Sequence, residues 1–216
     1  MRIRITFAKQ GALRYTGHLD LHKIWERVAR RADLPLTYSQ GFHPQPKMQL
    51  AAALPLGFSS RCELLDMRIE GGTDLSALPA RLQMAAPPGL KIIKVEEIDE
   101  ASPPLQTQVI AAEYEAALPD EIDENELTRS LAAVLAAETL PRERRGKAYD
   151  LRPLIEELTL TPLPLEEGRT GQRVIFMRLT ALAGATGRPE EVLAALGIEY
   201  EGTRVERTKL IFREPH

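Results

Sequence analysis

The order of strand-like and helix-like segments places the strongest limit on how this chain can fold. Apolar residues recur at the spacing of strands and helices in the order strand, helix, strand, strand, helix, strand. The first half shows these segments at residues 2–7, 21–32, 47–54, 65–69, 75–84 and 90–98. The second half repeats the order at residues 109–117, 125–137, 157–163, 173–182, 189–196 and 204–212. A duplication is inferred from element order alone, because the residues themselves do not repeat.

This order predicts an α+β fold built from two consecutive βαββαβ units of the ferredoxin-like kind, each with an antiparallel sheet. We expect the first unit at residues 1–100 and the second at residues 106–216. The proline-containing stretch that begins at Ser102 is the expected joint. Asp20, a residue type that caps helices, is expected to cap the first helix just before Leu21.

The cysteine count limits the chemistry that the chain can hold. Cys62 is the only cysteine among the 216 residues, so no internal disulfide forms. One thiol also cannot hold an iron–sulfur cluster or a thiolate zinc site. A reducing cytoplasm is the expected location. We expect no cofactor and no membrane association, since no apolar run approaches the ~20 residues of a membrane span.

Charge is distributed unevenly along the chain, although the net charge is only −3. Residues 1–50 contain nine Lys or Arg and three Asp or Glu, whereas residues 51–140 contain six and sixteen. A basic segment of this kind favours contact with an anion such as RNA. The alternative is a solvated helix face that the acidic middle of the chain balances.

Residues 38–47 form the strongest candidate site. Glycine permits close backbone approach there, and two prolines stiffen the segment. The side chains that we expect to bind an RNA base or a nucleotide-like ring are Tyr38, Gln40, Phe42, His43 and Lys47. An aromatic ring beside donors and a cation suits such a ligand. The alternative is a structural crossing loop.

Two further groups of residues are candidates. His18 precedes the first predicted helix and, with Lys9, Arg14 and Arg27, would suit a phosphate. The alternative is that His18 only hydrogen-bonds a neighbouring loop. His18 also begins a His-x-Asp-x-His pattern, which is a weak metal-binding signal, and we expect no metal. A second basic patch begins at Arg142 and is expected to be a flexible, solvated loop, with contact to RNA or to a partner's acidic surface as the alternative. Its candidate RNA-binding residues are Arg144, Arg145, Lys147 and Arg152.

Several segments together resemble a known bacterial family. They are residues 14–21 (RYTGHLDL), 38–47 (YSQGFHPQPK), 54–57 (LPLG), 150–155 (DLRPLI) and 188–193 (RPEEVL). Together they resemble the radical-SAM-linked domain of unknown function, and the resemblance spans nearly the whole chain. It implies a radical SAM protein as a partner. The chain lacks a CxxxCxxC motif, so it is not itself a radical SAM enzyme.

These observations favour a non-catalytic module that binds RNA or a nucleotide-like ligand and assists a radical SAM protein. The first alternative is an enzyme that acts on a small molecule or RNA, with His18, Asp20 and His43 as acid–base groups. The second is a protein-interaction adaptor whose binding surface is a sheet face. A single cleft that joins His18 and His43 would favour the enzyme.

Overall fold

A computed structural model describes residues 1–118, 122–144, 146–162, 173–200 and 203–213. Contacts between Cα atoms divide the chain into two compact units, Met1–Val109 and Ile110–His216. Both units combine helices with antiparallel strand pairs, so the fold is α+β, as the sequence predicts. No helix in the described part of the chain is long and apolar enough to cross a membrane.

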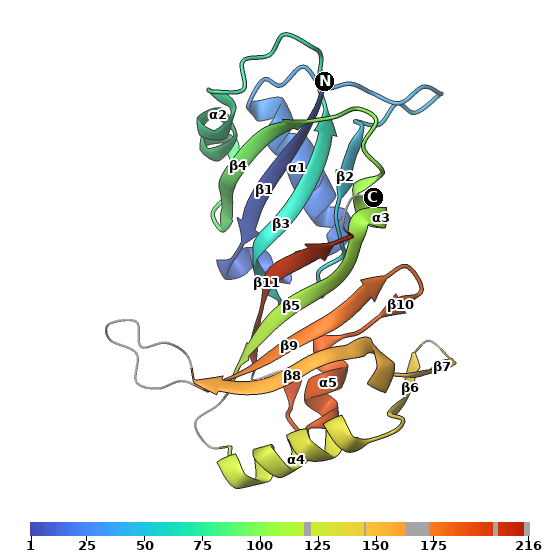
Figure 1. Cartoon of the computed structure of the whole chain (residues 1–216). Coiled ribbons are helices and arrows are strands. Elements are labelled where there is room, and N and C mark those ends of the chain that lie inside the picture. Colours follow the sequence, from blue (N-terminus) through green and yellow to red (C-terminus); the bar gives the residue numbers. More distant parts are fainter. Residues whose placement is uncertain (119–121, 145, 163–172, 201–202, 214–216) are drawn as a thin grey trace. The chain divides into compact units, whose positions relative to one another are not determined.

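The first unit contains one antiparallel sheet in the order β4-β1-β3-β2 (Figure 1). Its elements are β1 (Arg2–Lys9), the 3-10 helix η1 (Gly11–Tyr15), α1 (His18–Arg31), β2 (Met48–Leu50), β3 (Ser59–Arg68), α2 (Leu78–Ala85), β4 (Leu90–Ile98) and α3 (Leu105–Gln108). β1 runs through the middle of this sheet, where Ile5 lies opposite both Leu65 and Val95.

The core of the first unit lies between this sheet and the helices. Ile3, Ile5 and Phe7 alternate along β1 and are fully buried, because every second side chain of a strand points to the same face. They pack with buried residues of α1, among which Trp25 meets Phe7 edge to face with ring centroids 4.8 Å apart. The polar residues Arg2 and Arg4 therefore point to the other face of the sheet.

The second unit is built around β9 and β5. Its elements are β5 (Val109–Ala117), α4 (Glu124–Ala136), β6 (Pro141–Arg144), β7 (Lys147–Asp150), the 3-10 helix η2 (Arg152–Leu154), β8 (Ile155–Pro162), β9 (Arg173–Leu182), β10 (Ala185–Thr186), α5 (Pro189–Ala195) and β11 (Arg204–Phe212). β9 lies between β5 and β8, and β5 lies between β9 and β11. Asp123 caps α4 by accepting a hydrogen bond from the Glu126 amide.

Two expectations about local structure are wrong. The first helix begins at His18 with Gly17 as its cap, so Asp20 lies inside the first turn instead of capping it. The Leu21 amide bonds to the Gly17 carbonyl, which adds a turn before the apolar pattern starts. The basic stretch after Arg142 is also not a loose loop, because β6 and β7 pair as a hairpin.

Candidate binding site

Residues 38–47 form a narrow loop that extends away from the sheet between α1 and β2 (Figure 1). Backbone bonds hold its two sides together: the Ser39 amide donates to the Gln45 carbonyl, and Tyr38 bridges to Pro46. The Ser39 hydroxyl also accepts from the Gln45 amide at 3.0 Å. These bonds give the loop a defined shape, although most of its side chains are exposed.

The tip of this loop presents an unshielded aromatic ring. Phe42 is fully exposed, and Tyr38, Gln40 and His43 are also exposed. Gly41, directly before Phe42, has a φ of +128°, a conformation that side chains other than glycine rarely adopt. A large apolar side chain held in water at a projecting tip is available to contact a partner.

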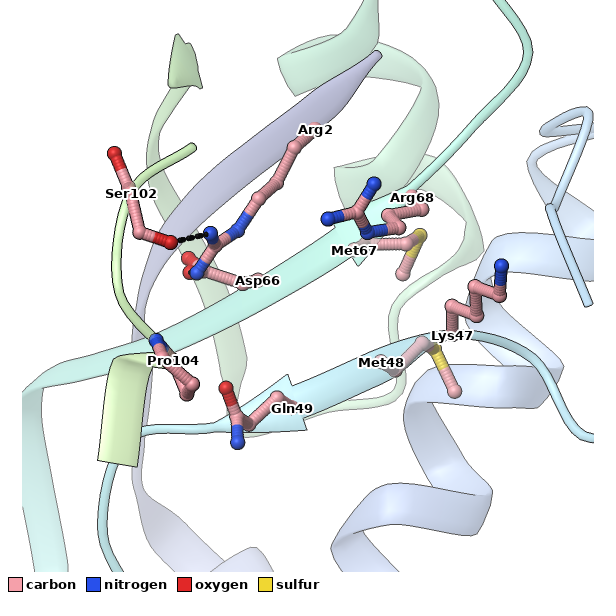
Figure 2. A pocket seen from close by; sticks show the side chains of 9 residues that line it. All are labelled: Arg2, Lys47, Met48, Gln49, Asp66, Met67, Arg68, Ser102 and Pro104. Atoms are coloured by element: carbon pink, nitrogen blue, oxygen red, sulfur yellow. Dashed lines mark hydrogen bonds and ion pairs between the residues drawn. The ribbon is translucent and has the colours of Figure 1, made fainter. Parts of the chain in front are cut away.

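A pocket of about 360 Å³ lies in the first unit at the base of the loop (Figure 2). Residues from β2, β3, the start of β1 and the segment before α3 surround it. They are Arg2, Lys47, Met48, Gln49, Asp66, Met67, Arg68, Ser102 and Pro104. Lys47 is the sequence-predicted residue among them, and it joins the loop to the pocket.

Arg2 and Asp66 form the buried wall of the pocket. The Arg2 guanidinium donates to the Asp66 carboxylate at 2.7 Å and to the carbonyl of Ser102 at 2.6 Å. Arg4 donates to the same carboxylate through Nε at 2.8 Å and Nη2 at 3.0 Å. Two arginines therefore satisfy Asp66, which leaves its charge more than neutralised.

Lys47 and Arg68 form the accessible cationic side of the pocket. The Arg68 amide donates to the Lys47 carbonyl at 2.9 Å, which fixes the two residues on neighbouring segments. Arg68 pairs with the carboxylate of Glu100, and that carboxylate also lies 3.3 Å from the Met1 amino group. The exposed Lys47 amine makes no hydrogen bond or ion pair with the described residues (Figure 2).

The residues predicted around His18 lie at the opposite end of β3. Lys9 is 1% exposed, and its amine donates to the carbonyls of Arg14 and Thr16 at 3.3 and 2.8 Å. The Arg14 guanidinium stacks over the neighbouring Tyr15 ring at 4.7 Å. Lys9 therefore supports the turn before α1. Arg27 lies on α1 itself, about 13 Å along the helix axis from His18.

The structure separates His18 from His43. Lys9, whose amine reaches the carbonyl of Thr16, pairs with Ser60 at one end of β3. The loop of His43 starts where the Thr37 amide bonds to the Arg68 carbonyl at the other end. Eight residues of extended strand separate these ends, a length of about 26 Å. The two histidines therefore do not share a cleft.

The His-x-Asp-x-His pattern lies on the first two turns of α1. His18 and His22 are four residues apart and share one face of the helix, whereas Asp20 points elsewhere and pairs with Lys23 at 3.7 Å. The described residues include no group of three or more His, Cys, Asp or Glu side chains that could hold a metal ion.

The second basic patch divides into exposed and structural residues. Arg144 and Lys147 are exposed on the β6–β7 hairpin, and Arg145 lies outside the described residues. Arg152 donates to the carbonyls of Leu135 and Ile155, so it ties η2 to the end of α4.

A tyrosine lies where this hairpin meets α5. Tyr149 pairs with Arg142, whose Nε lies 3.4 Å from the Glu191 carboxylate. Burial raises the pKa of the Tyr149 phenol, and the negative charge of Glu191 raises it further, whereas Arg188 and Arg142 oppose the shift. The phenol therefore stays protonated at neutral pH, although its oxygen has no hydrogen-bond partner among the described residues.

The sequence analysis did not single out Arg2 and Asp66, which form the buried wall of the pocket, although the alternation along their strands indicated where they lie. Arg2 and Arg4 alternate with Ile3 and Ile5, and Asp66 lies between the buried residues Leu65 and Met67. The charged members must therefore share the outer face of the sheet once the two strands pair. The pairing itself, with Arg4 opposite Asp66, is a long-range contact that the alternation does not specify.

Fold and sequence together define the class of protein: an α+β chain of two compact units, the first of which has a basic pocket beside a projecting aromatic loop. A family model described as an uncharacterized protein conserved in bacteria, DUF2344, matches residues 2–189. The chain belongs to this family. No curated protein matches the chain.

The chain is also similar to one chain in the crystal structure of a Cbf5-Nop10-Gar1 complex. The two chains are 12% identical, with a TM-score of 0.48. The match covers 96% of this chain and 48% of the other, so this chain spans about half the length of its structural neighbour.

Proposed function

We propose that the chain is a non-catalytic module that binds single-stranded RNA, or a ligand with the same base-and-phosphate chemistry, on its first unit. The observation that carries this proposal is Phe42, a fully exposed ring on a loop that Ser39 and Gln45 hold in shape. Bases of every kind stack on such rings, and each stacked base contributes about 1–3 kcal/mol.

The charges beside the loop support the same ligand. The accessible cations of the pocket at its base, Lys47 and Arg68, are of the type that contacts backbone phosphates. A ring that stacks and cations that neutralise phosphates are the two components of sequence-tolerant binding to single strands.

We infer that both units are ferredoxin-like, and the sheet order β4-β1-β3-β2 of the first unit supports this assignment. Some four-stranded sheets of this kind stack RNA bases on aromatic residues of the open sheet face. The corresponding positions here include Arg2, Arg4 and Asp66, which bond to one another. The proposed contact is therefore the 38–47 loop and not the centre of the sheet face.

The geometry gives no support to acid–base catalysis by His18 and His43 together. Such a role requires both groups within hydrogen-bond reach of one substrate. His18 lies near one end of β3 and the loop of His43 starts at the other, and the length of about 26 Å between these ends exceeds this reach.

The test is titration of a fluorescently labelled single-stranded RNA with the whole chain, followed by anisotropy at several salt concentrations. We expect Phe42→Ala to weaken binding between about 5-fold and about 150-fold, because one stacking contact is lost. Phe42→Trp keeps a stacking ring and should keep the affinity. Binding should weaken steadily as salt increases.

Met84→Ala is the matched control, because Met84 is a large apolar side chain on α2 that is 89% exposed. It should bind RNA as the unmodified chain does. Absence of binding at low salt, or equal affinities for the Phe42→Ala and Met84→Ala variants, would contradict the proposal.

A radical SAM protein is proposed as the partner on the resemblance of the motifs alone, and a cytoplasmic location stays a prediction. Affinity purification from the native host, with the bound proteins and RNA identified, tests the partner. Repeated purification without any radical SAM protein would remove it from the proposal.

A further inference from the structure

The pocket at the base of the 38–47 loop has two cations that its own walls do not neutralise. Asp66, the carboxylate of the lining, accepts three charged hydrogen bonds of 2.7–3.0 Å, one from Arg2 and two from Arg4. Arg2 is further fixed by the carbonyls of Ser102 and Pro103. An incoming anion therefore meets Lys47 and Arg68 and not this buried network.

Arg68 already binds an anion from within the chain. Glu100, in the segment after β4, places its carboxylate on the Arg68 guanidinium. Both side chains are partly in water, with 41% and 45% exposure, and an ion pair that is exposed in this way is weak. The same carboxylate also lies 3.3 Å from the Met1 amino group. It thus marks a position where an anion is held, and an incoming phosphate would compete with it for Arg68.

We propose that Lys47 and Arg68 form a phosphate-binding site and that Glu100 occupies it in the absence of ligand. The ligand class is a phosphate group carried by a nucleotide or an RNA backbone, so this inference rests on the proposed function. Arg68 presents a planar fork of donors that matches phosphate oxygens, and Lys47 supplies a second, unpaired charge. The pocket volume of about 360 Å³ lies within the range of sites for small molecules.

The first experiment measures the affinity of the labelled RNA for the whole chain carrying Glu100→Gln. Removal of the internal competitor should tighten binding about two- to five-fold, the equivalent of an exposed ion pair. The matched control is Glu97→Gln, which removes an equal charge from an exposed residue of β4. A gain in affinity that is the same in both variants would overturn the inference, because it would reflect net charge alone.

The second experiment tests whether Glu100 affects RNA binding through Arg68 or only through the net charge of the chain. Lys47→Gln and Arg68→Gln should each weaken binding and each lower the slope of log affinity against log salt by about 0.7, the value of one contact to a single strand. In the Arg68→Gln background, Glu100→Gln should have no further effect. A gain that persists without Arg68 would overturn the inference.

Inorganic pyrophosphate tests the site without RNA. It should raise the thermal midpoint of the unmodified chain, raise that of Glu100→Gln more, and leave that of Arg68→Gln unchanged. Equal shifts in all three would overturn the phosphate site. A second result would also overturn the phosphate site: Phe42→Ala loses RNA binding, but Arg68→Gln binds RNA normally. In that case the proposed RNA-binding function would stand.

Discussion

Asp66 is the residue on which the outer face of the first sheet depends. It is buried and holds both Arg2 and Arg4. We expect Asp66→Ala to lower the free energy of unfolding by about 3–5 kcal/mol, because Arg2 would keep its burial and lose its counter-charge. Urea denaturation followed by Trp25 fluorescence measures this, since Trp25 is the only tryptophan and is fully buried in the same unit.

The control for that measurement is Glu96→Gln, which breaks an ion pair with Lys94 at 2.7 Å. Both side chains of this pair are exposed, so the loss should be at most about 1 kcal/mol. If the Asp66 variant were no less stable than the Glu96 variant, the buried network would contribute nothing beyond an ordinary surface pair.

Lys9 illustrates why charge counted along a sequence overstates the charge offered to a ligand. It follows Ile3, Ile5 and Phe7 at the same period of two, so the strand pattern places it on the inner face. The carbonyls of Arg14 in η1 and of Thr16 just after it accept hydrogen bonds from its amine there. Neither the count of cations nor the resemblance to a family contains this information, which depends on how the chain turns after β1.

At the scale of elements, the predicted ends of four strands agree with the structure. The segments 90–98, 109–117, 173–182 and 204–212 coincide with β4, β5, β9 and β11. The two strands with the clearest alternation are longer than predicted: β1 runs two residues past the predicted 2–7, and β3 begins six residues before the predicted 65–69. β2 is shorter than expected, at Met48–Leu50, because a continuous apolar run marks burial and not the extent of pairing. The β6–β7 hairpin was missed, since charged residues such as Arg142 and Arg144 show no apolar alternation.

The start of β4 shows how a helix can close the edge of a sheet. Gln83 of α2 donates to the Leu90 carbonyl at 3.2 Å and accepts from the Ile92 amide at 2.8 Å, as a neighbouring strand would. We expect Gln83→Ala to cost about 1–2 kcal/mol, the value of two hydrogen bonds. It should also speed hydrogen exchange at the Ile92 amide, and NMR measures that rate directly.

The control for Gln83→Ala is Gln40→Ala, which makes the same substitution at an exposed position in the 38–47 loop. Its side chain makes no hydrogen bond with the described residues, so the free energy of unfolding should change little. Equal stabilities of the Gln83 and Gln40 variants would show that water replaces the amide of Gln83 without loss.

For the whole molecule, the uneven charge predicts where RNA should bind. Hydrogen–deuterium exchange of the chain with and without the labelled RNA compares all described segments at once. We expect slower exchange in residues 38–50 and at the Arg68 end of β3, and no change in α4 and β8. Protection confined to residues 141–150 would instead move the binding surface to the hairpin that bears Arg144 and Lys147.

The bonds of Arg2 to residues 102 and 103 have a consequence for how the chain is made. During synthesis Arg2 leaves the ribosome about one hundred residues before the carbonyls that complete its surroundings. At translation rates of about 5–20 residues per second, the Arg2 guanidinium lacks these two carbonyl acceptors for about 5–20 seconds. β1 therefore stays an unfinished centre of its sheet until the segment after β4 has emerged, which makes completion of the first unit a late event in its own synthesis.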